Sequence, residues 1–431
     1  MTFPIFAYIA VLLLAALLST RLMKILKLPN VTGYIITGII VGPFVFGLLF
    51  NNFSYEGIKE SVIYQYIDKI SWVSTVALGF IAFSIGTSFK VQILKAVGKR
   101  VIIITIFEAL FASLFVIAAL VAAHFMFPDH VSWELVLTLG AIASATAPAA
   151  TLMVIKQYRA RGPLVNTLLP VVALDDAAAL ILFSILFQVS MTIAGGGGFS
   201  FYKMLVKPIL EILMSLAFGA LLGFFIGFMN KFFLSRNNRL IFCIFSVFAA
   251  LGIYMLFKQP QLGEFELSSL LMCMMAGAIY TNMRKDSDKT LDVMDRFTSP
   301  IYMMFFVISG ASLDLTIFGS KSGLIVVSIA FVYLVFRVVG KWIGAFTGAS
   351  ITNCEPKVKK YLGFTLVPQA GVAIGLATTS SKLFSLHEAT QEASVMIIAI
   401  ILTSTLIYEL VGPMVSKYAL NKAGEIAPDA Q

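Results

Sequence analysis

Charged residues are scarce in this sequence. Asp, Glu, Lys and Arg together make up 12% of the 431 residues, whereas 59% are hydrophobic. A soluble globular domain is about one quarter charged, so the composition excludes that class and favours a membrane protein. Only three cysteines occur, Cys243, Cys273 and Cys354, and no two are spaced as a CxxC pair, which argues against a disulfide framework or a thiolate metal site.

A phosphate-binding loop of the form GxxxxGK[ST] is also absent, so this chain is not expected to drive transport by nucleotide hydrolysis. We expect a protein that is not an enzyme and that needs no cofactor. What the sequence does have is long apolar segments, and lipid admits only helices or closed barrels. Segments of about 20 apolar residues indicate helices rather than the shorter alternating strands of a barrel.

Thirteen such segments predict an all-α membrane protein with about 13 transmembrane helices, forming a single transmembrane domain over residues 1–431. The predicted spans are approximately 3–23, 30–50, 70–89, 101–126, 133–155, 164–189, 205–230, 239–257, 265–283, 298–318, 322–350, 360–381 and 391–416.

Basic residues are distributed unevenly between these spans. The loops after odd-numbered spans, with the C-terminal tail, hold 22 Lys and Arg residues, and the alternate loops hold 7. The positive-inside rule therefore predicts a multi-pass protein of the cell (inner) membrane with its N-terminus outside and its C-terminus in the cytoplasm. This orientation accounts for the net charge of +9 without a nucleic-acid partner, and the bilayer is the expected surrounding.

Short motifs recur seven spans apart. FIAFSIGTSFK in the third span resembles the segment around Gly310 in the tenth, with Gly86 and Gly310 aligned, and Pro148 of the fifth span corresponds to Pro368 of the twelfth. Because seven is odd, the two halves must be inverted in the membrane. Inverted repeats are typical of secondary transporters, whose substrate sites lie near the midplane between the repeats.

The repeat divides the chain into consecutive parts. Repeat one covers about 1–190, a linker helix about 205–230, repeat two about 239–416, and a short cytoplasmic tail 417–431.

The fifth and twelfth spans each contain a proline among small or polar residues, in SATAPAAT and LVPQAGVA. Proline removes a backbone donor, which lipid tolerates where a helix is broken beside a cavity. Pro148 and Pro368 therefore predict crossed discontinuous helices, with Thr146 and Gln369 as polar groups at the breaks. A simple proline kink in each span is the alternative.

Charges at bilayer depth cost about 2.5–3.5 kcal/mol even on the mildest scale, so they are candidate functional residues. Five residues qualify: Glu108, Asp175, Asp176, Arg337 and Lys341. The predicted spans place the two aspartates and the two cations at similar depths, so that they can meet.

Adjacent aspartates on a helix point about 100° apart and face different surroundings. One division places Asp175 against a basic partner and Asp176 in a water-filled cavity, where it binds either a proton or a monovalent cation. Lysine can lose its proton when desolvated and arginine effectively cannot. We therefore expect Lys341 to be the switchable partner of Asp175, and Arg337 to be a fixed cation paired with Glu108. Alternatively, Lys341 extends to the cytoplasmic surface.

At these residues the chain resembles the bacterial monovalent cation:proton antiporters, in the branch of two-aspartate sodium/proton antiporters and Kef-type exchangers. The segments that carry the resemblance are LPNVTGYIITGIIVGP, ATAPAATLMVI with RARGPL, VVALDDAAAL, GKWIGAFTGA and LVPQAGVAIGLA.

The resemblance implies a core of spans 4–6 and 11–13 that moves against a scaffold of spans 1–3 and 8–10, and a homodimer formed through the scaffold. It also implies that Asp176 carries the ion, that Asp175 forms a salt bridge and that Lys341 is its lysine partner. Gln369 departs from the family pattern, since many relatives carry arginine after this proline.

We therefore predict exchange of Na⁺ (or Li⁺ or K⁺) for H⁺ by alternating access. Paired aspartates and a titratable Lys341 favour two protons per cation, which makes the exchange electrogenic. The alternatives are an electroneutral K⁺/H⁺ efflux exchanger, a non-transporting membrane sensor of the same fold, and an organic-anion symporter.

Overall fold

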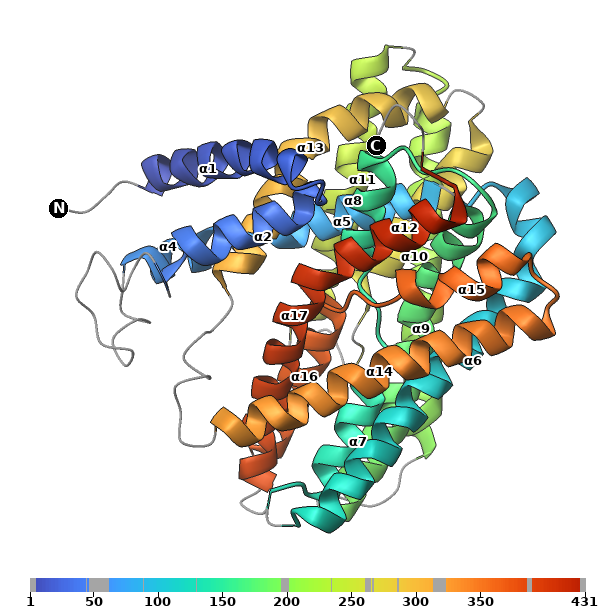
Figure 1. Ribbon diagram of the computed structural model, residues 1–431. Helices are drawn as coiled ribbons and strands as arrows, with labels where there is room; N and C mark the ends of the chain where they lie inside the picture. The colour runs from blue at the N-terminus through green and yellow to red at the C-terminus, as the bar shows by residue number, and fades with distance from the viewer. Residues whose placement is uncertain are drawn as a thin grey trace. The chain divides into compact units, whose positions relative to one another are not determined.

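The computed structural model describes residues 5–43, 45, 62–87, 89–128, 130–194, 201–233, 235–259, 265, 267–284, 287–312, 323–385 and 390–426, and no strand occurs in these ranges (Figure 1). The helices of the first half are α1 (Ile5–Ile25), α2 (Asn30–Val41), α4 (Val62–Ile70), α5 (Trp72–Thr87), α6 (Val91–Met126), α7 (Trp133–Ile142), α8 (Pro148–Gln157) and α9 (Pro163–Ile193). A short π-helix, η3 (Tyr202–Val206), leads to α10 (Lys207–Met229), α11 (Arg236–Phe257), α12 (Ser269–Met283), α13 (Ser287–Ala311), α14 (Gly323–Ile351), α15 (Pro356–Thr365), α16 (Gly371–Phe384) and α17 (Gln391–Ala423).

Each of the thirteen predicted segments coincides with one helix or with two consecutive helices, which confirms the all-α membrane fold. Within the described residues, eight helices are long and apolar enough to cross a membrane. The boundaries differ most at α6, which begins at Val91, at α13, which begins at Ser287, and at α17, which continues to Ala423. Residues 46–50 and 313–318, at the ends of two predicted spans, lie outside the described residues.

The chain divides into two compact units, and each contains segments from both halves of the sequence. Unit 1 comprises Met1–Ala96 and Leu210–Leu313, and unit 2 comprises Val97–Ile209 and Asp314–Gln431. Unit 1 therefore holds the spans that the resemblance groups as a scaffold, and unit 2 holds those that it groups as a core.

In unit 1, two helix pairs pack backbone to backbone: α5 with α12, and α2 with α13. Both helices of each pair contribute a glycine so close to the partner that an added Cβ would collide with its backbone: Gly86 at Met274, Gly277 at Phe83, Gly38 at Val307 and Gly310 at Ile35. Each pair joins a first-half helix to a second-half helix, and the aligned glycines Gly86 and Gly310 occupy corresponding contacts. The packing therefore follows the inverted repeat that the sequence motifs predict.

In unit 2, two membrane spans are interrupted. The fifth span is split into α7 and α8 by residues 143–147, and the twelfth into α15 and α16 by residues 366–370. Pro148 stands at the first turn of α8, where a missing N–H costs nothing, and Pro368 lies within the second break. The two breaks meet, because the Ala147 N–H donates to the Pro368 carbonyl at 2.9 Å. The discontinuous helices are thus confirmed, and a simple kink is excluded for both spans.

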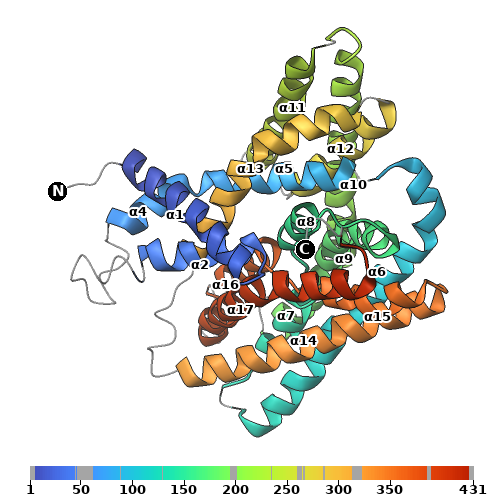
Figure 2. The ribbon, with the colours of Figure 1, turned by 45° about the horizontal axis from the view of Figure 1, so that its top comes forward.

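Helix α14 crosses α6 within the same unit (Figures 1 and 2). Three glycines spaced four residues apart on α14 form the contact. An added Cβ would lie 2.6 Å from the Phe111 carbonyl oxygen at Gly340, and 2.6 Å from Glu108 Cα at Gly344. A Cβ at Gly348 would lie 2.8 Å from the Cα atom of Ile104, one turn earlier on α6. Small residues at this spacing let two membrane helices approach closely.

The first turn of α9 is capped from a distant part of the chain. The Glu425 carboxylate accepts hydrogen bonds from the backbone N–H groups of Leu164 at 2.7 Å and Val165 at 2.9 Å. Glu425 follows Gly424, whose left-handed conformation (φ 71°) ends α17. Gly162, at φ 155°, lies against the Glu425 side chain, where no other residue type would fit without strain. The segment after α17 therefore satisfies the free donors of the helix that carries both aspartates.

Candidate ion-exchange site

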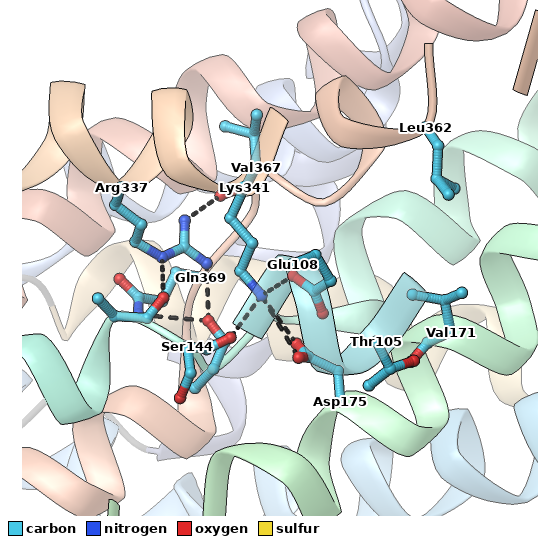
Figure 3. Close-up of polar contacts among 12 residues, drawn as sticks. Thr105, Glu108, Ser144, Val171, Asp175, Arg337, Lys341, Leu362, Val367 and Gln369 are labelled. Atoms are coloured by element: carbon cyan, nitrogen blue, oxygen red, sulfur yellow. Dashed lines mark hydrogen bonds and ion pairs between the residues drawn. The ribbon is translucent and has the colours of Figure 1, made fainter. Parts of the chain in front are cut away.

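The residues predicted for the site all belong to unit 2, and their charged side chains are buried. Exposure is 0% for Glu108, Asp175, Arg337 and Lys341 and 3% for Asp176. Lys341 therefore does not extend to the cytoplasmic surface. Figure 3 shows how side chains from α6, α9 and α14 converge on the break between α7 and α8.

The Lys341 ammonium lies between two carboxylates from different helices (Figure 3). Its Nζ is 2.5 Å from Glu108 Oε2 on α6 and 3.2 Å from Asp175 Oδ2 on α9. It also donates to the backbone carbonyl of Ser144, in the break after α7. The contacts with Ser144 and Asp175 are hydrogen bonds, and the contact with Glu108 is an ion pair. Lys341 is thus bound to α6, to α9 and to the end of α7 at once.

The close approach of α14 to α6 explains the pair of Lys341 with Glu108. Gly340 and Gly344 flank Lys341 on the face of α14 that touches α6, and Gly344 lies directly against the Glu108 backbone. The expected pair of Glu108 with Arg337 is therefore wrong. Arg337 is one turn earlier on α14, and the helix contact directs Glu108 to Lys341 rather than to Arg337.

Arg337 binds the broken helices. Its Nε donates to the Ala143 carbonyl at 2.9 Å, and its two terminal nitrogens donate to Val367 at 2.8 Å and Ala145 at 2.7 Å. The guanidinium also lies over the Tyr408 ring, 4.7 Å from its centroid. Carbonyls at the ends of α7 and α15 have no intrahelical partner and carry partial negative charge. The planar fork of arginine satisfies three of them at once, which is the physical reason that it is not available to Glu108.

Gln369, from the other break, shares one of these acceptors, the Ala145 carbonyl, with Arg337. Its Nε2 donates to Ile142 at 3.0 Å and to Ala145 at 3.3 Å, and its Oε1 accepts from the Tyr333 hydroxyl at 3.0 Å. Gln369 therefore ties the two interrupted helices together. No sequence signal indicated Tyr333 or Tyr408, because a buried tyrosine on an apolar helix has no distinguishing pattern.

Asp176 and Thr146 differ from these satisfied groups. Both are buried, yet neither the two Asp176 carboxylate oxygens nor Thr146 Oγ1 has a hydrogen-bond partner among the described residues. A buried carboxylate that has no hydrogen-bond partner is very unfavourable when it is ionised. Binding a proton or a cation removes this cost. The Glu108 oxygens also make no hydrogen bond, but Glu108 forms an ion pair with Lys341. Asp176 is therefore the carboxylate of this cluster that has neither a hydrogen bond nor an ion pair among the described residues, and it has free capacity to bind a proton or a cation.

Interrupted helices that meet at their breaks, beside a buried cluster of carboxylates and an ammonium, define a membrane transporter that exchanges ions. The sequence model of the family described as "Sodium/hydrogen exchanger, transmembrane" matches residues 9–417, so the chain belongs to this family. It is a multi-pass membrane transporter, not an enzyme, and it exchanges a monovalent cation for a proton.

The fold is also found among solved structures. The sodium proton antiporter MjNhaP1 from Methanocaldococcus jannaschii, determined at pH 8, superposes with a TM-score of 0.66 and 17% sequence identity. The superposition covers 96% of this chain and 98% of that protein. Among curated protein sequences, none matches this chain. At this identity the likeness concerns the fold alone.

Proposed function

We propose that the protein exchanges Na⁺, with Li⁺ and K⁺ as alternative cations, for H⁺ by alternating access, and that Asp176 carries the ion. The observation that supports this most directly is the buried Asp176 carboxylate, whose two oxygens have no protein partner among the described residues. A proton and a hard monovalent cation both satisfy such a group, and they compete for it. Competition for one carboxylate couples the two ions without any other machinery.

Each surrounding group has a distinct task in this proposal. Thr146 Oγ1 is an oxygen without a partner and supplies a neutral ligand to the cation. Asp175 is held by Lys341 and tunes the negative charge next to Asp176. Arg337 and Gln369 fix the ends of the broken helices, so that the polar backbone at the breaks stays in place in lipid.

Electrogenic exchange, with two protons per cation, is expected if Lys341 releases a proton in each cycle. That expectation depends on Asp175 as the only carboxylate partner of Lys341.

The family resemblance supports a homodimer, and the basic loops support a location in the inner membrane. We retain the homodimer and the inner-membrane location as proposals. Mass measurement in lipid nanodiscs tests the dimer.

The test is a cation panel in proteoliposomes that contain a pH-sensitive dye. The wild type should move protons when Na⁺, Li⁺ or K⁺ is added, and the preferred ion should give the lowest KM. Asp176→Asn should abolish the response, because an amide cannot exchange a proton for a cation. The matched control is Asp68→Asn, an exposed aspartate on α4 that should leave exchange unchanged.

Normal exchange by Asp176→Asn would rule out the site. Absence of exchange by the wild type with every cation would favour a sensor that has the transporter fold. Exchange with K⁺ alone would favour a K⁺/H⁺ efflux exchanger.

A further inference from the structure

We propose that Glu108 is the fixed counter-ion of Lys341, which keeps the ammonium charged throughout the transport cycle and makes the exchange electroneutral. This inference rests on the proposed function and specifies its coupling. Glu108 acts through Lys341 and does not touch the transported ion, so it is a positioning residue.

The first observation is the relative length of the two ion pairs. Lys341 Nζ is 2.5 Å from Glu108 Oε2 and 3.2 Å from Asp175 Oδ2. The attraction between opposite charges grows as the distance between them falls, so the shorter ion pair is the stronger one at equal burial. Glu108 is thus the closer carboxylate of Lys341, although Asp175 is the partner that the resemblance implies.

The second observation is that Glu108 and Lys341 lie on two helices whose backbones are in direct contact. Gly344 packs against the backbone of Glu108, and Gly340 packs against the same helix one turn later. The side chains of Glu108 and Lys341 therefore originate from two backbones in direct contact. Asp175 comes from a third helix, α9, which also carries Asp176. The pair with Glu108 is fixed by helix packing, and the pair with Asp175 is the one that can change.

The third observation is the burial of all groups around the ammonium. The ionisable groups that face Lys341 are Glu108 from α6 and Asp175 from α9, with Asp176 beside Asp175, and Arg337 one turn away on α14 is bound to carbonyls. Glu108 and Lys341 are both 0% exposed. If Lys341 lost its proton, Glu108 would remain as a buried charge without its counter-ion, which is strongly unfavourable.

The ion balance follows from a constant Lys341–Glu108 pair. In the proton-loaded state, Asp176 holds one proton. In the cation-loaded state, one monovalent cation replaces that proton on Asp176, and Asp175 can turn toward the cation while Lys341 stays paired with Glu108. One proton leaves for one cation that enters, so the cluster has the same net charge in both states.

Without Glu108, Asp175 is the only carboxylate partner of Lys341. When Asp175 turns toward the cation, the ammonium has no counter-ion and releases its proton. Two protons then leave for each cation, and one net charge crosses the membrane in each cycle. Glu108→Gln should therefore convert an electroneutral exchanger into an electrogenic one.

The experiment measures proton flux driven by voltage alone. Proteoliposomes have equal pH and equal Na⁺ on both sides, and a thiocyanate gradient sets the membrane potential. A permeant anion is used because a cation gradient could itself drive the transporter. A potential of about 100 mV shifts the equilibrium of a cycle that moves one net charge about 50-fold. Asp176→Asn liposomes give the background proton leak.

The wild type and the matched control Glu392→Gln, an exposed glutamate on α17, should show no flux above this background. Glu108→Gln should show voltage-driven acidification of the negative interior. Glu108→Asp retains the charge and should remain insensitive to voltage even if its exchange is slower.

Voltage-driven flux in the wild type would overturn the inference. A protonated Glu108 would give this result, because it has no charge to balance Lys341. Exchange by Glu108→Gln that is insensitive to voltage would overturn it as well. Neither result would affect the proposed function, which fails only if the wild type shows no cation-dependent proton flux or if Asp176→Asn retains it.

Discussion

At the scale of single residues, Arg337 shows how a buried cation can serve the backbone rather than the transported ion. Each of its three nitrogens donates to a carbonyl at a helix break. Lysine keeps the charge but has one nitrogen and cannot span the three acceptors. We predict that Arg337→Lys lowers the temperature of unfolding in detergent, because each buried carbonyl left unsatisfied costs about 1–3 kcal/mol.

The matched control for this substitution is Arg161→Lys, an exposed arginine of the same unit, which should unfold at the wild-type temperature. Equal unfolding temperatures for Arg337→Lys and wild type would show that the carbonyls do not depend on the guanidinium.

The sequence identified the charged residues of the site and the pair of Lys341 with Asp175, but not the partners of Glu108 and Arg337. A charge within an apolar span stands out, so Glu108, Asp175 and Lys341 could be found by inspection. Arg337 and Lys341 are four residues apart on one helix face, and depth alone cannot distinguish which of them meets which carboxylate. The acceptors of Arg337 are backbone carbonyls, which every residue has and no sequence pattern marks.

At the scale of helices, the contact between α6 and α14 aligns the cluster. A Cβ at Gly344 would lie 2.6 Å from Glu108 Cα, so an alanine there must push the two backbones apart. We predict that Gly344→Ala lowers stability by about 1–3 kcal/mol through overpacking and reduces exchange, because a displaced α14 moves Lys341 and Arg337 away from the helix breaks that they bind. Denaturant unfolding and proteoliposome flux measure the two effects.

Gly375→Ala is the control, since nothing lies within 4 Å of a Cβ at that position on α16. Alanine should be neutral or stabilising there, as expected for an unhindered helical site. Wild-type stability and exchange in Gly344→Ala would mean that the glycine contact does not position Lys341 and Arg337.

Helix interruptions were predictable, whereas helix contacts were not. Proline at corresponding positions of two inverted halves indicated both breaks, because its effect on the backbone is local. The start of α13 at Ser287 was missed, since the first turns of that helix are polar and a search for apolar residues does not include them. Motif alignment also showed that Gly86 and Gly310 are equivalent, but equivalence does not reveal that α5 packs on α12 and α2 on α13.

At the scale of the whole molecule, the orientation in the membrane is testable with two single cysteines. The three native cysteines are buried, so they should react slowly. We predict that His130→Cys, between α6 and α7, reacts with a membrane-impermeant maleimide in intact cells. Glu355→Cys, between α14 and α15, should react only after permeabilisation. The opposite pattern would reverse the orientation derived from the basic loops.

The class of fold could be predicted at this scale, but the division into units could not be derived from composition. Apolar segment lengths and the seven-span repeat are properties of continuous sequence. Each unit instead joins segments more than 100 residues apart, such as α2 with α13, and such contacts leave no mark on composition or periodicity. The grouping was suggested only by the family resemblance.

The cap on α9 has a consequence for biosynthesis. The Leu164 amide and the Glu425 carboxylate that it binds are 261 residues apart. At about 5–20 residues per second, a ribosome needs roughly 13–50 s to reach Glu425 after it has made Leu164. During that interval the helix with both aspartates enters the membrane with its first amides uncovered. A nascent chain released before this closing step would therefore present an incomplete helix end, which cellular quality control could recognise.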